Sequence, residues 1–375
     1  MKIIKTTSLW NQFRKVKRFF IKLTEMRWRI SKFDGKPLTP DIQNEMQIII
    51  KKNRNIYLCS EDAARNLSAK WHSCVVHPQS PRFIETAVPV VLSGNDAYAP
   101  FMAVMLQSLL DNSNPERKYH FIFFESDFSD WTKERLTEQI LNFPHCMIDF
   151  VNTKNALDDI PFALNSIRFS KDIFSRFFIP YWLNKYPKVI YCDSDMLAKA
   201  DISKLYDMDM QDYCIGATSN QWLNSVLNRR NYSSLISFAI FSLLENWPRY
   251  INSGLLVFNS KKFRELYSCN DLIKFTIYYT NRYKKIFPDQ DILSFLFKDN
   301  CFILPPEWNC CWTPTEKNNR YYLQTADSNI NIIHFTSYRK PWKDLPEMTN
   351  NPTAQAYRDY AKNIPLFNEY FAVKH

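Results

Sequence analysis

Apolar positions follow two different periods along most of the chain, beginning near residue 86. Short apolar runs alternate with longer stretches in which apolar residues recur every three or four positions. The short runs predict buried strands and the longer stretches predict helices, and their alternation is typical of a mainly parallel sheet covered by helices on both faces. Strands are expected at 87–94, 119–126, 146–152, 188–191 and 250–259, and helices at 99–113, 129–143, 171–186 and 287–297.

The first 32 residues show a single apolar stripe instead. Its members, from Trp10 to Ile30, are spaced by three or four positions, and residues 1–32 hold ten basic residues. This pattern predicts an amphipathic helix, which either lies on an anionic membrane surface or docks on the body of the protein. The chain therefore divides into a basic helical N-terminal extension (1–85), an α/β domain (86–345) with a helical insertion at 219–249, and a C-terminal helical tail (346–375).

Charge is distributed unevenly along the chain. The protein has 48 Lys and Arg against 38 Asp and Glu, a formal net charge of +10. Residues 1–80 hold sixteen of the basic and six of the acidic residues, so residues 81–375 are balanced, with 32 of each. A nucleic-acid-binding protein would carry basic residues over its folded body. The balance argues against nucleic acid as a partner and leaves residues 1–32 as the candidate contact with an anionic membrane surface.

Cysteines and hydropathy indicate where the protein works. The nine cysteines are odd in number, scattered and without a CxxC pair, a pattern that fits neither a disulfide framework nor a zinc site. No stretch approaches about 18 uninterrupted apolar residues, and the first twenty residues lack the apolar core and cleavage site of a signal peptide. These features predict a cytoplasmic protein, or one that is peripheral on the inner face of the cell membrane.

Two carboxylates directly follow one of the apolar runs. In KVIYCDSD, a predicted strand ends in Asp193 and Asp195. Side chains alternate along an extended chain, so both carboxylates face the same side and can reach one hard cation. An acidic turn that caps a helix is the alternative interpretation. Asn95, Asp96 and Tyr98 follow the first predicted strand, and because ligands collect at the carboxyl ends of parallel strands, both clusters are expected at one cleft.

Five sequence blocks together resemble glycosyltransferase family 8, whose retaining enzymes include lipopolysaccharide galactosyl- and glucosyltransferases and glycogenin. The blocks appear in the family's order between residues 88 and 345 and read VVLSGNDAYAPFMAVMLQSLL, SRFFIPYWLNKYPKVIYCDSDML, YINSGLLVFNSKKF, FPDQDILSFLF and NIIHFTSYRKPW. The resemblance implies a GT-A-type fold, which is a Rossmann-like α/β domain that binds a nucleotide sugar beside a mainly parallel central sheet. The strand and helix pattern agrees with that fold.

The resemblance also implies a metal site. In the family, the two DxD aspartates bind Mn²⁺ together with a histidine near the end of the domain. Asp193, Asp195 and His334 are therefore expected to hold Mn²⁺, with Mg²⁺ as the alternative ion. Taken alone, His334 would more often be a hydrogen-bonded core histidine. The implied donor is UDP-glucose or UDP-galactose, whose diphosphate oxygens would meet the metal.

The donor-binding residues implied by the resemblance come from several blocks: Asn95, Asp96, Tyr98, Arg176, Asp193, Ser194, Asn252 and Lys340. Arg176 matches an arginine near the donor, and a structural ion pair is the alternative. Asn252 matches an amide that contacts the donor sugar, and pairing with the backbone is the alternative. Lys340 matches a lysine that contacts the diphosphate. The sequence departs from the family at Asn95 and at Ser337, where a glycine is usual.

The block FPDQDILS supplies the expected catalytic residues at the start of a predicted helix, where carboxylates also gain from the helix dipole. By resemblance, Asp289 binds sugar hydroxyls and Gln290 lies beneath the anomeric carbon, whereas Asp291 is structural. A glutamine amide is a poor nucleophile because its oxygen carries no full charge. We therefore expect the acceptor to attack on the face that UDP leaves, with a transient covalent adduct as the alternative.

Together, the motifs and the resemblance predict a metal-dependent, retaining glycosyltransferase that moves a hexose from a UDP-sugar to a lipopolysaccharide, lipooligosaccharide or other surface glycan. Two alternatives stay open. One is a glycogenin-like enzyme that glycosylates itself or another protein, and the other is a catalytically silent binding protein of the same fold. The presence of CDSD, His334 and DQD argues against silence.

Overall fold

The computed structural model describes residues 85–373, apart from 158–170, 221–249, 284–287, 298, 313–329, 337–339, 344, 346–347 and 349–350. The amphipathic helix expected in residues 1–32 lies outside the described residues, as does the rest of the N-terminal extension up to residue 84. Nearly all of the expected insertion at 219–249 lies outside them as well.

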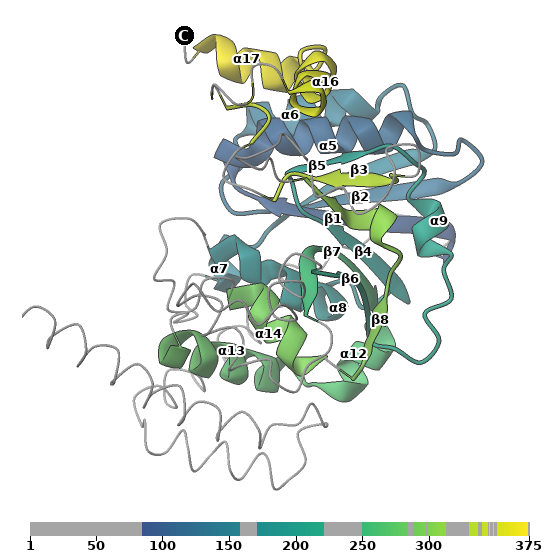
Figure 1. Cartoon of the computed structure of the whole chain (residues 1–375), viewed down its shortest axis with the longest axis vertical. Coiled ribbons are helices and arrows are strands. Elements are labelled where there is room, and N and C mark those ends of the chain that lie inside the picture. The colour runs from purple at the N-terminus through teal and green to yellow at the C-terminus, as the bar shows by residue number, and fades with distance from the viewer. Residues whose placement is uncertain are drawn as a thin grey trace, which may run out of the picture.

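A seven-stranded sheet forms the centre of the described fold (Figure 1). In spatial order its strands are β3 (Cys146–Asn152), β2 (Lys118–Glu125), β1 (Ala87–Gly94), β4 (Lys188–Cys192), β7 (Ile251–Asn259), β6 (Ile215–Ser219) and β8 (Cys301–Ile303). Neighbours from β3 to β4 are parallel, and so are β6 and β8. β7 runs antiparallel to both β4 and β6. The sheet is therefore mainly parallel, as the sequence predicts.

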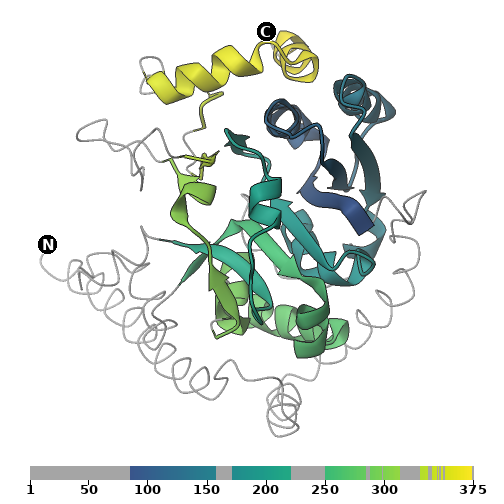
Figure 2. The same cartoon turned by 90° about the vertical axis from the view of Figure 1, so that its right-hand side faces the viewer.

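Helices cover both faces of this sheet (Figure 2). One face is covered by α5 (Ala99–Asp111) and α6 (Asp130–Ile140), beside which lie α16 (Pro352–Ala361) and α17 (Pro365–Val373). The other face carries α7 (Lys154–Leu157), the 3₁₀ helix η2 (Lys171–Phe178), α8 (Ile179–Trp182), α12 (Ser260–Leu266), α13 (Cys269–Tyr283) and α14 (Pro288–Leu296). Three further short helices are η1 (Asp96–Tyr98), α9 (Ser203–Tyr206) and η3 (Pro306–Asn309).

Two hydrophobic cores lie on the two faces because side chains alternate along the central strands. In β1, Val88, Val90 and Leu92 pack into the core under α5, whereas Val91 packs into the core that contains η2, α8 and α14. Burial of one such aliphatic side chain is worth about 1.5–3 kcal/mol. A strand that must fill both cores reads as a continuous apolar run, which explains the pattern in the sequence.

The prediction of one α-helix at 171–186 is wrong in both helix type and length. Residues 171–178 form the 3₁₀ helix η2, and α8 extends only from Ile179 to Trp182. Pro180 has no backbone N–H, so an α-helix that entered from Arg176 would lose its hydrogen bond there. The other expected strands and helices are present, each within a few residues of its expected bounds.

A second, three-stranded sheet places residues 332–334, near the C-terminal end of the α/β domain, beside the carboxyl end of β4. It consists of β5 (Met196–Ala198), β10 (Ile332–His334) and β9 (Cys310–Cys311), with β10 in the middle. The antiparallel register pairs Met196 with His334, and the backbone N–H of Phe335 donates to the carbonyl of Asp195 at 2.9 Å. Because β5 begins directly after Asp195, this small sheet holds His334 beside the CDSD loop.

Candidate active site

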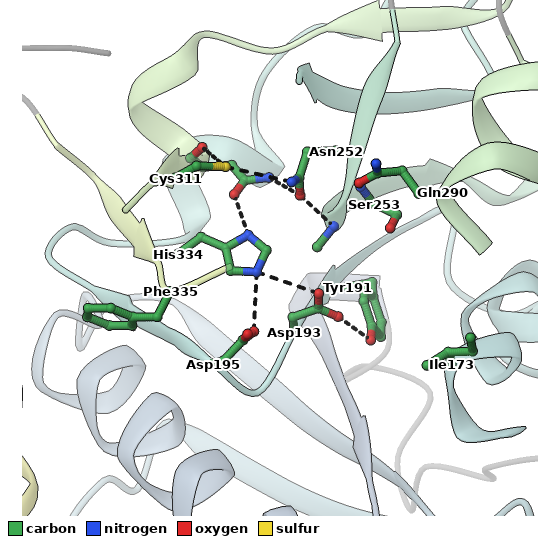
Figure 3. Close-up of polar contacts among 12 residues, drawn as sticks. Ile173, Tyr191, Asp193, Asp195, Asn252, Ser253, Gln290, Cys311, His334 and Phe335 are labelled. Carbon is green, nitrogen blue, oxygen red and sulfur yellow. Dashed lines mark hydrogen bonds and ion pairs between the residues drawn. The ribbon is translucent and has the colours of Figure 1, made fainter. Parts of the chain in front are cut away.

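The two aspartates of the CDSD loop meet His334 beyond the end of β4 (Figure 3). Nε2 of His334 lies 3.2 Å from Oδ1 of Asp195 and 3.7 Å from Oδ2 of Asp193. One ligand atom from each of the three residues lies within 4.8 Å of the other two. The His334 side chain is 4% exposed, whereas those of Asp193 and Asp195 are 24% and 15% exposed. The structure thus brings together the three residues that the sequence singles out as metal ligands.

The donor atoms of this cluster suit a divalent cation. Two carboxylates and one imidazole form a mixed O, O, N set, which Mn²⁺ accepts readily. Nδ1 of His334 is hydrogen-bonded to Oδ1 of Asn309 at 2.8 Å, so the ring is oriented with Nε2 toward the carboxylates. Three protein ligands leave positions of an octahedral ion open for other oxygens. The residues present therefore fit the ion that the resemblance implies.

Gly254 of β7 makes room for the imidazole. A Cβ atom at this position would lie 2.2 Å from Cε1 of His334 and 2.9 Å from Oδ2 of Asp193. Both separations are far below van der Waals contact, so the close approach requires a residue without a side chain. The carbonyl of Gly254 also accepts a hydrogen bond from the backbone N–H of Asp193 at 2.7 Å. One glycine therefore fixes both the CDSD loop and the space for its histidine partner.

Cationic side chains balance the two aspartates. Arg176 lies 3.0 Å from Oδ1 of Asp193, and the ammonium group of Lys340 contacts Oδ2 of Asp195. Burial raises the pKa of Asp193 above its usual range, although Arg176 opposes this shift. For Asp195 the effect of burial is outweighed by Lys340 and His334, which hold its pKa well below the usual range. Burial lowers the pKa of His334, but Asp195 outweighs it and raises that pKa to about 10.

Arg176 also connects the CDSD loop to the start of α14. Its Nη1 lies 3.0 Å from Oδ2 of Asp289 and donates to the carbonyl of Ser253 at 2.9 Å. The guanidinium group lies 4.5 Å from the ring centroid of Tyr191, whose hydroxyl donates to Oδ1 of Asp193 at 2.8 Å. At the position expected to lie near the donor, Arg176 therefore forms the buried ion pairs that the sequence left as its alternative role.

The two expected catalytic residues share an anchor on β7. The Ser253 hydroxyl donates to Oδ2 of Asp289 at 2.9 Å, and its backbone N–H donates to Oε1 of Gln290 at 3.2 Å. Figure 3 shows Gln290 beside Ser253. Both expected catalytic residues are more than nine-tenths buried. Asp291, for which the sequence predicts a structural role, accepts a hydrogen bond from the Tyr250 hydroxyl at 2.7 Å.

Asn252 has protein partners for both ends of its amide. Oδ1 accepts hydrogen bonds from the backbone N–H of Gly254 at 2.9 Å and from Nδ2 of Asn309 at 3.0 Å. Nδ2 donates to Sγ of Cys311 at 3.6 Å. The contact with Gly254 matches the alternative in which Asn252 is a buried asparagine paired with the backbone, and Asn309 and Cys311 add side-chain partners.

The loop after β1 is tied to the start of α6. Oδ1 of Asp96 accepts hydrogen bonds from the Thr132 hydroxyl at 2.6 Å and from the backbone N–H of Ser129 at 3.2 Å. Oδ1 of Asn95 is buried and has no hydrogen-bond partner among the described residues, and Tyr98 is 44% exposed. Because β1 and β4 are parallel neighbours, this loop lies at the same edge of the sheet as the CDSD loop.

The two remaining expected donor residues lie next to the metal ligands. Ser194, between the two aspartates, is 8% exposed. Lys340 donates to the carbonyl of Phe335 at 2.5 Å in addition to its contact with Asp195. In this structure its ammonium group therefore lies on a carboxylate expected to bind the metal.

Three residues that contact the predicted site residues were not predicted from the sequence: Tyr191, Ser253 and Asn309. Ser253 could have been found from the block INSG. Side chains alternate along a strand, so Ser253 must point to the opposite face of the sheet from Asn252 and Gly254. Tyr191 looks like any other apolar strand residue. Asn309 lies in PPEWNC, where no spacing singles it out, and only the pairing of β9 with β10 brings it to His334.

A GT-A-like architecture with these clusters at the carboxyl ends of its parallel strands defines the class of protein as a glycosyltransferase. The chain belongs to glycosyl transferase family 8, whose model matches residues 89–345. General stress protein A of Bacillus subtilis (strain 168) is 26% identical over 279 residues, which are 72% of this chain and 90% of that protein. Lipopolysaccharide 1,2-glucosyltransferase of Escherichia coli is 24% identical over 291 residues, which are 72% of this chain and 75% of that protein.

Solved structures support the same fold. The galactosyltransferase LgtC, in complex with donor and acceptor sugar analogs, has a TM-score of 0.57 at 21% identity, over 74% of this chain and 96% of that chain. The bifunctional enzyme WbbM has a TM-score of 0.65 at 23% identity, over 80% of this chain and 53% of that chain. This chain therefore spans about half of WbbM. At these identities the likeness shows the fold alone.

In the part of the chain that the structure describes, every helix is too short or too polar to cross a lipid bilayer.

Proposed function

We propose that the protein is a metal-dependent, retaining hexosyltransferase that moves glucose or galactose from UDP-glucose or UDP-galactose to a lipopolysaccharide, lipooligosaccharide or other surface glycan. The observation that carries this proposal is the convergence of Asp193, Asp195 and His334 at the carboxyl end of β4. These residues would hold Mn²⁺, with Mg²⁺ as the alternative. A bound ion there supplies Lewis-acid stabilisation of the departing diphosphate.

The nucleotide would lie along the edge where β1 and β4 end. Tyr98 offers an exposed ring for stacking on uracil, and Asn95, whose buried Oδ1 has no hydrogen-bond partner among the described residues, lies in the same loop. Asp96 keeps this loop in place through α6. Lys340, whose ammonium group contacts Asp195, would bind the diphosphate, and Ser194 lies between the metal ligands.

The donor sugar would lie over the start of α14. Asp289 would accept hydrogen bonds from its hydroxyls, and Arg176 orients that carboxylate through their ion pair. The amide oxygen of Gln290, held by the backbone N–H of Ser253, stabilises positive charge at the anomeric carbon. Because a neutral amide is a weak nucleophile, the acceptor oxygen would attack the anomeric carbon on the face that UDP leaves, as the bond from that carbon to the diphosphate oxygen breaks. The proton of the acceptor hydroxyl would pass to the departing diphosphate oxygen, and the configuration is retained.

The acceptor is proposed from the relatives and from the charge of the chain. Two Escherichia coli relatives are named lipopolysaccharide 1,2-glucosyltransferase, which supports a glycolipid acceptor. Such an acceptor is presented at a membrane, where the ten basic residues among residues 1–32 would be attracted to anionic lipid. We therefore propose a cytoplasmic enzyme that associates peripherally with the inner face of the membrane.

The test is release of UDP from a panel of UDP-sugars, with Mn²⁺, with chelator, and with Mn²⁺ restored. We expect turnover with UDP-glucose or UDP-galactose that chelator abolishes and Mn²⁺ restores. Asp193→Asn and Asp195→Asn each remove a charged ligand and should lower turnover by about 10²-fold or more while the protein stays folded. Asp212→Asn, at an exposed aspartate on the surface, is the matched control and should keep full activity. Full activity of Asp195→Asn in chelator would disprove the metal-dependent mechanism.

A further inference from the structure

We propose that Asn309 is a positioning residue that fixes the proton of His334 on Nδ1, so that Nε2 presents its lone pair to the metal. Asn309 touches His334 and Asn252 but is not itself one of the clustered metal ligands. The inference rests on the metal site of the proposed function and adds a residue on which the affinity of that site depends.

A chain of hydrogen bonds determines which atom of the Asn309 amide faces the histidine. The chain starts at the backbone N–H of Gly254, which can only donate, and which lies 2.9 Å from Oδ1 of Asn252. That oxygen also contacts the Asn309 amide at 3.0 Å, so the contacting group must be Nδ2. The other end of the amide, Oδ1, is then the atom 2.8 Å from Nδ1 of His334.

The direction of this last hydrogen bond determines the state of the imidazole. An amide oxygen accepts and cannot donate, so Nδ1 of His334 must carry the proton. In the neutral ring the lone pair is then on Nε2, the nitrogen that lies 3.2 Å from Asp195 and 3.7 Å from Asp193. The other tautomer would direct an N–H at the metal position and leave Nδ1 and Oδ1 of Asn309 as two facing acceptors.

Because Asn309 and its two partners are buried, turning its amide around would cost free energy. Asn309 is 1% exposed, His334 3% and Asn252 6%, so water has little access to replace a lost partner. A buried polar group left without a hydrogen bond costs about 1–3 kcal/mol. The backbone also holds Asn309 in place, because it directly precedes β9, where Cys311 pairs with His334. The amide is therefore preset by the fold before any ligand arrives.

Two variants of Asn309 separate positioning from simple packing. Asn309→Leu removes the acceptor for Nδ1 at similar volume. Asn309→Asp keeps an acceptor for Nδ1 but loses the donor to Asn252 and places a carboxylate against its Oδ1. Mn²⁺ affinity is measured on the whole protein from the loss of the free-ion EPR signal, without substrate, and folding is checked by thermal melting. Asn259→Ala is the control, since it removes a side chain that caps α12 at the far end of β7.

Positioning predicts that Asn309→Leu weakens Mn²⁺ binding by about 10- to 100-fold, whereas Asn309→Asp stays within about threefold of the unmodified protein. The control should bind Mn²⁺ normally, although its stability falls. Unchanged Mn²⁺ affinity in Asn309→Leu, or an equal loss of Mn²⁺ affinity in both variants, would overturn this inference but not the proposed function. If the Leu variant does not fold, a loss of more than about tenfold in Asn309→Asp overturns it. Absence of Mn²⁺ binding in the unmodified protein would overturn the metal site of the proposed function together with this inference.

Discussion

At the scale of single residues, Gly254 leaves the tightest space in the site. In Gly254→Ala, the new methyl group would lie 2.2 Å from Cε1 of His334, so the imidazole must move. Overpacking of this kind costs about 1–3 kcal/mol, and we expect Mn²⁺ affinity to fall by about tenfold or more. Gly216→Ala on the neighbouring strand β6 is the control, because its nearest contact is a movable Leu304 methyl group at 3.2 Å. Equal Mn²⁺ affinity in the two variants would contradict the packing argument.

Some residues of the candidate site could be predicted from the sequence, and others could not. Asp193 and Asp195 can be predicted as one cluster because alternation along an extended chain needs no tertiary information. His334 is more than a hundred positions away, and only the order of the family blocks pointed to it. Asn309 was not predicted, since its contact with His334 depends on the pairing of two short strands. Site residues that are close together in the sequence can thus be predicted, whereas contacts between segments far apart in the sequence require the structure.

At the scale of elements, the loop after β1 depends on α6 for its position. Thr132 is 1% exposed, and its hydroxyl donates to Oδ1 of Asp96 at 2.6 Å, which ties the candidate base-binding loop to the helix. Thr132→Val keeps the shape of the side chain but removes this bond, worth about 1 kcal/mol. We expect the KM for the UDP-sugar to rise about fivefold with kcat nearly unchanged, as measured by UDP release. Thr137→Val on the same helix should change neither constant, and a fall in kcat alone for Thr132→Val would contradict this assignment.

Element types and positions were largely predictable, but directions and helix types were not. A continuous apolar run predicts a buried strand without indicating which way it points, so the antiparallel direction of β7 could not be deduced. Its direction matters because residues at its start, Asn252 and Ser253, thereby reach the carboxyl end of β4. The 3₁₀ form of η2 was likewise hidden, although Pro180 was a visible reason to expect an interruption.

At the scale of the whole molecule, the ten basic residues among residues 1–32 predict binding to anionic lipid. Full-length protein should sediment with vesicles containing anionic lipid at low salt, but not with zwitterionic vesicles and not at high salt. Replacing Arg14, Lys15, Lys17 and Arg18 with Gln should weaken binding by about 10²-fold or more, at roughly 1 kcal/mol per residue. The control replaces Lys261 and Lys262 on α12 and should bind normally. Equal sedimentation of the two variants would contradict a membrane role for the extension.

The charges around the CDSD loop have a consequence for how the protein is made. The carboxylates of Asp193, Asp195 and Asp289 are held by contacts with Arg176, Lys340 and His334. These contacts hold the cluster together without a metal, unlike small zinc domains that unfold when the metal is withdrawn. In the proposed metal-dependent enzyme, a newly synthesised chain would therefore adopt its final shape during manganese starvation. The proposed function then predicts that a cell in that state holds an intact reserve of protein, which becomes active as soon as the ion is supplied.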